Sequence, residues 1–289
     1  MKKLKNYIKL LRIHHYIKNF LVFAALGCSG QLFQLNKFTY AGFGFAAFCM
    51  TSSAIYIIND IRDKEKDQLH PIKCRRPIAS GEVREKEALS LLAVVLLVAG
   101  LFNGIVYKPF SSFLLALYFL FNLFYSLGLK NKPLVDVAIL TSGFLIRVLY
   151  GAVITEIEIS NWLYLTVIVL AFYFSLGKRR NELTRTSANG ETRKVLKYYT
   201  VAFLDKNMYM CLGLANTFYS LWCMDSSTIS HYGKSLVFTI PMVLLITMKY
   251  SMDVEGNSDG DPVEVLLHDK VLLLLCVLYT LVMFVALYL

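Results

Sequence analysis

The sequence is short of charge and of paired cysteines for its length. Of its 289 residues, 17% are Asp, Glu, Lys or Arg and 56% are apolar, whereas soluble domains carry roughly 25% charged residues. Six cysteines without one CxxC pair exclude a secreted scaffold held together by disulfides. The length would suit about two soluble domains, but so much apolar sequence cannot be buried inside a globule of this size. The composition therefore predicts an integral membrane protein.

The sequence also lacks a strong internal repeat, a low-complexity tract and a separate soluble domain. Its net charge is +10, which in a soluble protein would favour a nucleic-acid partner. Here the Lys and Arg residues lie between apolar segments. They therefore predict membrane topology first and phosphate groups of lipids or substrates second, and no nucleic-acid partner is expected.

Nine apolar segments approach the roughly 20 residues that a helix needs to cross a bilayer. They are residues 19–35, 38–58, 87–107, 110–128, 133–154, 161–177, 208–224, 235–250 and 271–289. Residues 1–18 precede them, and the stretch 2–18 predicts a basic amphipathic helix that lies on the membrane surface. The predicted fold is all-α: one polytopic membrane domain over 1–289 with nine transmembrane helices.

The distribution of basic residues supports this map. With the N-terminus in the cytoplasm, 26 of the 30 Lys and Arg residues fall on the cytoplasmic side when Lys249, at the cytoplasmic end of the segment 235–250, is counted there; three fall on the opposite side, and Arg147 lies within a span. Cytoplasmic loops are enriched in Lys and Arg, so the split favours a cytoplasmic N-terminus and a C-terminus on the opposite side. The large loops 59–86 and 178–207 are then cytoplasmic and hold most of the polar chemistry.

The first of these loops begins with a regular series of oxygen-bearing side chains. Asn59, Asp63 and Asp67 are spaced four residues apart, which places them on one face of a helix. Oxygen ligands stacked in this way repel one another unless a hard cation lies among them. Mg²⁺ binds through one or two carboxylates plus substrate phosphates, so the series predicts a magnesium site. The alternative interpretation is a solvated acidic face paired with neighbouring lysines, which contributes little energy.

Cations follow in both loops. Lys73, Arg75 and Arg76 come within ten residues of the acidic series, and Lys178 and Arg179 stand where the second loop begins. Arg grips phosphate oxygens through two hydrogen bonds, and Lys binds them as a point charge. Mixed carboxylates and cations beside a membrane therefore indicate a metal-bound diphosphate. The plainer alternative is a positive-inside anchor.

Arg147 is a cation deep within a predicted span, and Lys18 stands directly before the first one. Intramembrane charges are costly and usually face a cavity or a partner, so Arg147 is expected to face a phosphate, with pairing inside the bundle as the alternative. A link to Asp136 is not expected, because eleven residues of helix rise by roughly 16 Å. Lys18 is either an interfacial anchor or a phosphate ligand.

Residues 59–67 read NDIRDKEKD and resemble the first Asp-rich motif, NDxxDxxxD, of the UbiA superfamily of intramembrane prenyltransferases. Most members carry a second Asp-rich motif between helices six and seven, where this sequence reads GKRRNE at 177–182. That departure is similar to the branch whose members transfer phosphoribosyl groups to decaprenyl phosphate for cell-wall arabinan precursors. Segments that look like this branch are 11–23, 70–81, 125–147, 177–182 and 260–269.

The resemblance implies transfer of 5-phosphoribosyl from phosphoribosyl diphosphate (PRPP) to a decaprenyl-type polyprenyl phosphate in a bacterial inner membrane, with release of diphosphate and dependence on Mg²⁺. The cationic motif suits a donor with a second phosphate at the far end of its sugar. Asn59, Asp63 and Asp67 are the expected metal ligands and catalytic residues. The expected contacts to PRPP or its phosphates are Lys18, Tyr56, Lys73, Arg76, Lys178, Arg179 and Glu182, and the lipid phosphate is assigned to Lys130 and Arg147.

Three alternatives remain at this point. The first is a prenyltransferase that moves a prenyl chain onto an aromatic or other small acceptor, which the cationic second loop disfavours. The second is an anion transporter, but transporters place charges near the midplane on broken helices, and here the carboxylates gather at one membrane face. The third is a non-catalytic membrane scaffold, which leaves the NDxxDxxxD motif without a reason.

Overall fold

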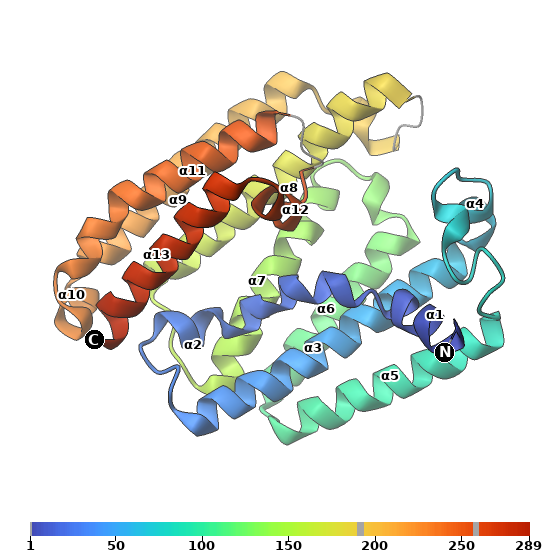
Figure 1. Cartoon of the computed structure of the whole chain (residues 1–289), viewed down its shortest axis with the longest axis horizontal. Helices are drawn as coiled ribbons and strands as arrows, with labels where there is room; N and C mark the ends of the chain where they lie inside the picture. Colours follow the sequence, from blue (N-terminus) through green and yellow to red (C-terminus); the bar gives the residue numbers. More distant parts are fainter. Residues whose placement is uncertain (1, 190–193, 257–259) are drawn as a thin grey trace. The chain divides into compact units, whose positions relative to one another are not determined.

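The computed structural model describes residues 2–189, 194–256 and 260–289, and helices are the only regular structure in those ranges (Figure 1). Within the predicted loop 178–207, residues 190–193 lie outside the described residues. The chain divides into two compact units. Unit 1 consists of residues 1–27, 31–127 and 146–157; unit 2 consists of residues 28–30, 128–145 and 158–289.

Unit 1 is built around one long helix, α3. Its elements are α1 (Lys2–Leu11), the 3-10 helix η1 (Ile13–Phe23), α2 (Ala24–Cys28), α3 (Leu35–Arg62), α4 (Lys64–Gln68), the 3-10 helix η2 (Lys73–Arg75), α5 (Glu85–Ile105), α6 (Pro109–Leu127) and the second half of α7 (Val135–Thr155). Helix α3 packs against α1, η1, α5 and α6. Gly151 allows a close approach to η1, because a Cβ atom there would lie 1.9 Å from the carbonyl oxygen of Val22.

Unit 2 is centred on the packing of α8 against α9. Its elements are the 3-10 helix η3 (Leu129–Asn131), the first half of α7, α8 (Asn161–Asn189), η4 (Lys194–Tyr198), α9 (Val201–Met224), α10 (Ser226–Tyr232), η5 (Ser235–Thr239), α11 (Ile240–Glu255), α12 (Pro262–His268) and α13 (Lys270–Tyr288). Side chains of Thr200, Asp225 and Asp261 cap the first backbone N–H groups of α9, α10 and α12. Helix α8 runs on through Lys178, so the second predicted loop begins as helix.

Seven helices of the described residues are long and apolar enough to cross a membrane. They lie at Leu35–Arg62, Glu85–Ile105, Pro109–Leu127, Val135–Thr155, Asn161–Arg185, Ser235–Glu255 and Lys270–Tyr288. Two of the nine predicted spans are not among them. The segment 19–35 forms the end of η1, the short α2 and turns, and 208–224 belongs to α9, whose apolar residues alternate with Asn216, Thr217 and Ser220.

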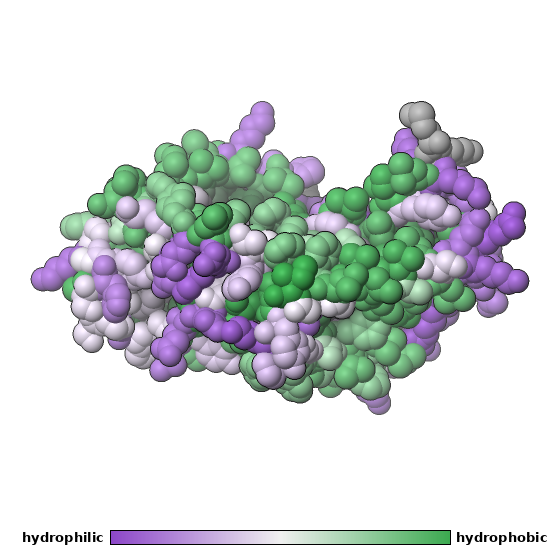
Figure 2. Space-filling view, turned by 90° about the horizontal axis from the view of Figure 1, so that it is seen from below, coloured by the Kyte–Doolittle hydropathy of each residue, from purple (hydrophilic) through white to green (hydrophobic). Residues whose placement is uncertain are grey.

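Large apolar side chains are exposed along several of these helices. Leu97 and Leu101 of α5 are 62% exposed, and Leu274 and Leu281 of α13 are 57% exposed. Figure 2 shows hydrophobic residues over broad areas of the face in view. Apolar patches of this extent are rare on soluble monomers, and a lipid bilayer is the environment that covers them.

The N-terminal segment differs from the predicted surface helix over 2–18. Helix α1 ends at Leu11, Arg12 adopts the left-handed conformation (φ 53°, ψ 49°), and η1 begins at Ile13. The hydroxyl of Ser53 donates to the carbonyl oxygen of Leu11 at 2.8 Å and satisfies the end of the helix. Leu10 is fully buried in a cluster with Ile78 and other core residues. The segment is therefore packed into unit 1 and broken at a defined residue.

Candidate functional site

The acidic series of unit 1 lies where α3 gives way to α4. The backbone N–H of Asp63 donates to the carbonyl oxygen of Asn59 at 2.9 Å, and the N–H of Asp67 donates to the carbonyl oxygen of Asp63 at 2.8 Å, so hydrogen bonds four residues apart link the two helices. Asp63 itself has φ −90° and ψ 8° and ends α3. Asn59 and Asp63 are half-buried, whereas Asp67 is buried. The series is thus interrupted at Asp63 and does not run along a single regular helix.

Two carboxylates of the motif are neutralised by arginines. Arg12 reaches Asp60 at 2.5 Å, and Nη1 of Arg76 reaches Asp60 at 3.2 Å and Asp67 at 2.5 Å. The side chain of Asp60 is 2% exposed and that of Asp67 is 6% exposed. Buried charges need such partners. Asp67 was predicted as a metal ligand, and in this arrangement its carboxylate is held by Arg76.

Asp60 and Arg12 were not among the residues predicted for the site. Asp60 is the second letter of the acidic motif and could have been included on that ground. Arg12 offered no signal, because it lies 48 residues away from its partner. The guanidinium carbon of Arg12 also lies 4.6 Å from the centroid of the Tyr56 ring, and the imidazole of His15 lies 5.3 Å from the same ring. Tyr56, a predicted substrate contact, is therefore fixed by the N-terminal segment.

The oxygen-bearing side chains of Asn59 and Asp63 are of the kind that suits a hard cation. Among the described residues no group of three or more His, Cys, Asp or Glu side chains is arranged to hold a metal ion. Asn59 and Asp63 provide an amide oxygen and a carboxylate beside the buried ion pairs. Mg²⁺ commonly takes only one or two protein carboxylates and completes its shell with phosphates and water. The two residues fit a magnesium ion that is bound together with a diphosphate.

The other predicted residues of unit 1 occupy different environments. Lys73 is exposed in η2, and Lys18 is half-buried in η1. Arg147 is 9% exposed; its Nε donates to Asn19 at 2.8 Å and its Nη2 donates to the Tyr118 hydroxyl at 2.9 Å. The guanidinium also lies over the rings of Phe48 and Tyr118. These contacts are the intrabundle pairing that was the alternative to a phosphate contact.

In unit 2, Arg179 is buried in a polar cluster. Its Nε lies 3.2 Å from Asp136, both side chains are 0% exposed, and its Nη1 pairs with Glu182 one turn along α8. The hydroxyl of Tyr199 donates to Asp136 at 2.6 Å. Burial, reinforced by that hydrogen bond, raises the pKa of Tyr199 to about 12, so its hydroxyl remains a donor at neutral pH. The predicted substrate contacts Arg179 and Glu182 are thus engaged with each other.

Lys178 and Lys130 are the other predicted cations of this unit, and both are half-buried. Lys178 lies where α8 meets the segment 260–269. Gly260 has a φ of 77°, and a Cβ atom there would lie 2.9 Å from the carbonyl oxygen of Gly177 and 3.0 Å from the Cα of Lys178. Only glycine combines this conformation with this contact. The segment 260–269 therefore supports the backbone at Lys178.

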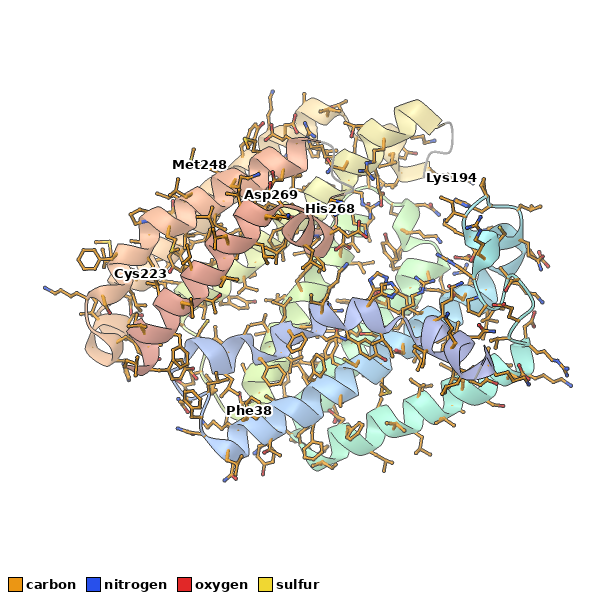
Figure 3. All side chains as sticks on the ribbon, in the orientation of Figure 1. Phe38, Lys194, Cys223, Met248, His268 and Asp269 are labelled. Carbon is orange, nitrogen blue, oxygen red and sulfur yellow. The ribbon has the colours of Figure 1, made fainter. Side chains whose placement is uncertain are left out.

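The same segment joins two helices through its acidic residues. Asp269, labelled next to His268 in Figure 3, precedes α13, accepts a hydrogen bond from the Leu272 N–H at 2.8 Å and pairs with Lys249 at 2.6 Å. These interactions lower the pKa of Asp269; the contact with Lys249 is the larger cause. Asp261 likewise accepts from the Val263 N–H at 3.1 Å. The sequence alone predicted no role for these two residues.

Comparisons with known proteins identify the family of the chain. The profile of the UbiA prenyltransferase family matches residues 20–179. The decaprenyl-phosphate phosphoribosyltransferase of Mycolicibacterium smegmatis is 35% identical over 287 residues, which cover 93% of this chain and 88% of that protein. Proteins of the same name from Mycobacterium tuberculosis and Corynebacterium glutamicum are both 33% identical; the alignments cover 93% and 97% of this chain and 89% and 86% of those proteins.

Solved structures share the fold. A UbiA homologue from Archaeoglobus fulgidus bound to GPP and Mg²⁺ superposes with a TM-score of 0.73 at 17% identity, and the match covers 98% of this chain and 99% of that one. A digeranylgeranylglyceryl phosphate synthase superposes with a TM-score of 0.67 at 18% identity, covering 99% of each chain.

Proposed function

The chain belongs to the UbiA prenyltransferase family, and we propose that it transfers the 5-phosphoribosyl group of PRPP to a polyprenyl phosphate and releases diphosphate. The observation that carries the proposal is the identity of 33–35% over at least 93% of the chain to three proteins named decaprenyl-phosphate phosphoribosyltransferase. A likeness of this extent includes both loops. The basic stretch at 178–180 adds to the argument, since a second phosphate on the donor calls for cations.

The residues of the acidic motif are assigned to the diphosphate end of the donor. Asn59 and Asp63 would hold Mg²⁺, with Asp67 in support through its contact with Arg76. A bound Mg²⁺ supplies Lewis-acid neutralisation of the leaving group. Lys73 is exposed and can bind phosphate oxygens as a point charge. Arg76 is assigned to the same task, with its remaining N–H donors.

The transfer needs no strong general base. An oxygen of the lipid phosphate, already ionised at neutral pH, attacks C1 of the ribose while the bond from C1 to the diphosphate oxygen breaks, and both electrons of that bond leave with diphosphate. Attack from the opposite face inverts the anomeric centre and gives polyprenyl-phosphoryl-5-phosphoribose. Rate then depends on orientation and on electrostatic stabilisation of the leaving group.

The remaining assignments belong to the same proposal. Lys178 and Lys18 contact phosphates of the donor, Tyr56 contacts PRPP, and Lys130 contacts the lipid phosphate. Arg179 and Glu182 are assigned to the phosphates of the donor and Arg147, with Lys130, to the lipid phosphate; all three side chains also contact other residues of the protein. The enzyme is an integral protein of the plasma membrane with nine spans, a cytoplasmic N-terminus and its active site on the cytoplasmic side.

The test uses detergent-purified protein, Mg²⁺ and polyprenyl phosphate. One reaction receives PRPP labelled in the ribose, and a parallel reaction receives a labelled prenyl diphosphate with aromatic acceptors. The expected result is lipid-soluble label from PRPP alone, abolished by EDTA. Label that enters product only from the prenyl diphosphate would identify a prenyltransferase and would contradict the proposal.

A further inference from the structure

Arg12 contacts two residues of the proposed site at once. Its guanidinium pairs with the buried carboxylate of Asp60 at 2.5 Å and lies over the ring of Tyr56 at 4.6 Å. Tyr56 and Asp60 are four residues apart on α3 and therefore share one face of the helix. One side chain from the N-terminal segment thus fixes two successive turns at the end of α3.

The backbone conformation of Arg12 supports a specific role for its contacts with Asp60 and Tyr56. A residue with a side chain at φ 53° and ψ 49° is held in a conformation that costs free energy and persists only where surrounding contacts compensate for it. Here the break between α1 and η1 turns the guanidinium toward Asp60 and away from the exposed basic face of α1. Glycine would make the same turn without strain, so the turn alone does not explain an arginine.

The contact continues into the loop that follows the acidic motif. Asp60 is shared by Arg12 and Arg76, and Arg76 also holds Asp67. Lys9 of the same segment donates from Nζ to the carbonyl oxygen of Arg75 at 2.8 Å. The N-terminal segment therefore holds the loop 69–76 at two points, through the ion pairs and through a main-chain carbonyl.

We propose that Arg12 is a positioning residue of the active site, which fixes Tyr56 and Asp60 and, through Asp60 and Arg76, the loop that carries Lys73. The inference rests on the proposed function. Arg12 and Arg76 neutralise the buried carboxylate of Asp60, and Arg76 also neutralises that of Asp67. Without Arg12, Arg76 is the remaining neutralising cation of two buried carboxylates, and its hold on the loop weakens.

The decisive variant is Arg12→Gly, which keeps the left-handed turn and removes the guanidinium. Arg12→Lys keeps the charge but loses the flat group over Tyr56. Lys3→Ala is the matched control, because Lys3 is a cation of the preceding helix α1 whose partner, at 3.2 Å, is Glu87 of α5. All variants are compared as folded, monodisperse protein of the full chain.

Two measurements are made on each variant. The first is the KM for PRPP together with kcat. The second is the alkylation rate of Cys74, followed by mass spectrometry of its peptide; this half-buried thiol lies in η2 between Lys73 and Arg75 and reports the order of the loop without any turnover.

We expect Arg12→Gly to lower kcat/KM for PRPP about tenfold or more, mainly through KM, and to speed Cys74 alkylation several-fold. Arg12→Lys should recover part of both effects, and Lys3→Ala should match the wild type. Wild-type KM and wild-type alkylation in Arg12→Gly would overturn the inference. So would a lower yield of folded protein with unchanged kinetics per folded molecule, because that is a structural role alone.

The outcome can be separated from a failure of the proposed function. If the wild type transfers no label from PRPP, the proposed function fails. The alkylation rate of Cys74 then still shows whether Arg12 fixes the loop. An alkylation rate that is the same in the wild type and in Arg12→Gly would by itself reject the inference.

Discussion

Single residues in this protein show how ionic groups are accommodated next to a membrane. Arg147 lies inside a span, yet its guanidinium donates hydrogen bonds to Asn19 and Tyr118. The same group lies over the rings of Phe48 and Tyr118. Arg179 is likewise paired with Asp136 and Glu182. Cations that the sequence suggests for substrate binding can therefore be paired with side chains of the protein itself. Lys73 is exposed and is better placed to bind a ligand.

Asp63 is the residue on which the proposed chemistry most depends. Asp63→Asn removes the carboxylate charge with little change of shape, and we expect transfer from PRPP to fall about a hundredfold or more. Radiolabel transfer at saturating Mg²⁺ measures the loss, and size-exclusion chromatography verifies folding. Glu65→Gln, two residues along on α4 and exposed, is the control that should stay active. Full turnover by Asp63→Asn would reject the metal assignment.

The residues of the acidic motif could be predicted from the sequence, but the residues with which they pair could not. Apolar length was sufficient to predict the helices α3, α5, α6, α7, α8, α11 and α13, because a long apolar run in a membrane forms a helix. The Arg12–Asp60 pair spans 48 residues, and no local pattern encodes such a contact. The break at Arg12 was not predicted either, because the residues that contact Leu11 and Arg12, which are Ser53 and Asp60, lie on α3.

At the scale of elements, the segment 260–269 connects neighbouring helices, a role that the sequence did not predict. Gly260 lies against the backbone of α8, and the side chains of Asp261 and Asp269 cap the N-termini of α12 and α13. Spacing alone did not show this, because N-caps are recognised only when the following helix is known to begin there.

Gly260 offers a test of this connection. Gly260→Ala adds a methyl group within 3.0 Å of Gly177 and Lys178 and strains the backbone at φ 77°. We expect a melting temperature several degrees lower and a higher KM for PRPP, since Lys178 moves with its backbone. The control is Gly213→Ala, where no atom lies within 4 Å of the added Cβ; a helical glycine replaced by alanine should leave stability equal or greater. Equal melting temperatures for both variants would contradict the role of Gly260.

Asp269 makes a prediction about pH. Its folded pKa is lowered, first by Lys249 and then by the Leu272 N–H, so its ionised form stabilises the protein above the ordinary aspartate pKa, and that contribution is lost as the pH falls through the lowered value. Asp269→Asn keeps a good N-cap and removes the charge. The melting temperatures of wild type and variant should therefore differ at about pH 6 and converge as the pH falls through the lowered pKa of Asp269. A difference that is constant across this range would show that the charge is not responsible.

At the scale of the whole molecule, the main question is how often the chain crosses the bilayer. Seven helices qualify by length and composition, whereas the charge distribution favours nine spans. The two maps differ in whether 19–35 and α9 cross. Large exposed apolar faces occur in both units, so lipid contact does not distinguish the maps.

Cysteine labelling from each side distinguishes them. With nine spans, Cys74 faces the cytoplasm and the exposed Ser230 of α10 faces the opposite side. A membrane-impermeant maleimide should then label Cys74 in inside-out vesicles and Ser230→Cys in right-side-out vesicles. If α9 does not cross, both positions react from the same side, and the nine-span topology is wrong.

The contact between Arg147 and Asn19 also sets an order of events during synthesis. The partners are 128 residues apart, and at roughly 5 to 20 residues per second the ribosome needs roughly 6 to 26 s to travel from one to the other. The N-terminal segment therefore emerges long before the arginine that fastens it. The partners of Leu11 and Arg12 on α3 are at most 48 residues away, so the first segment can be held to α3 well before it is held to α7.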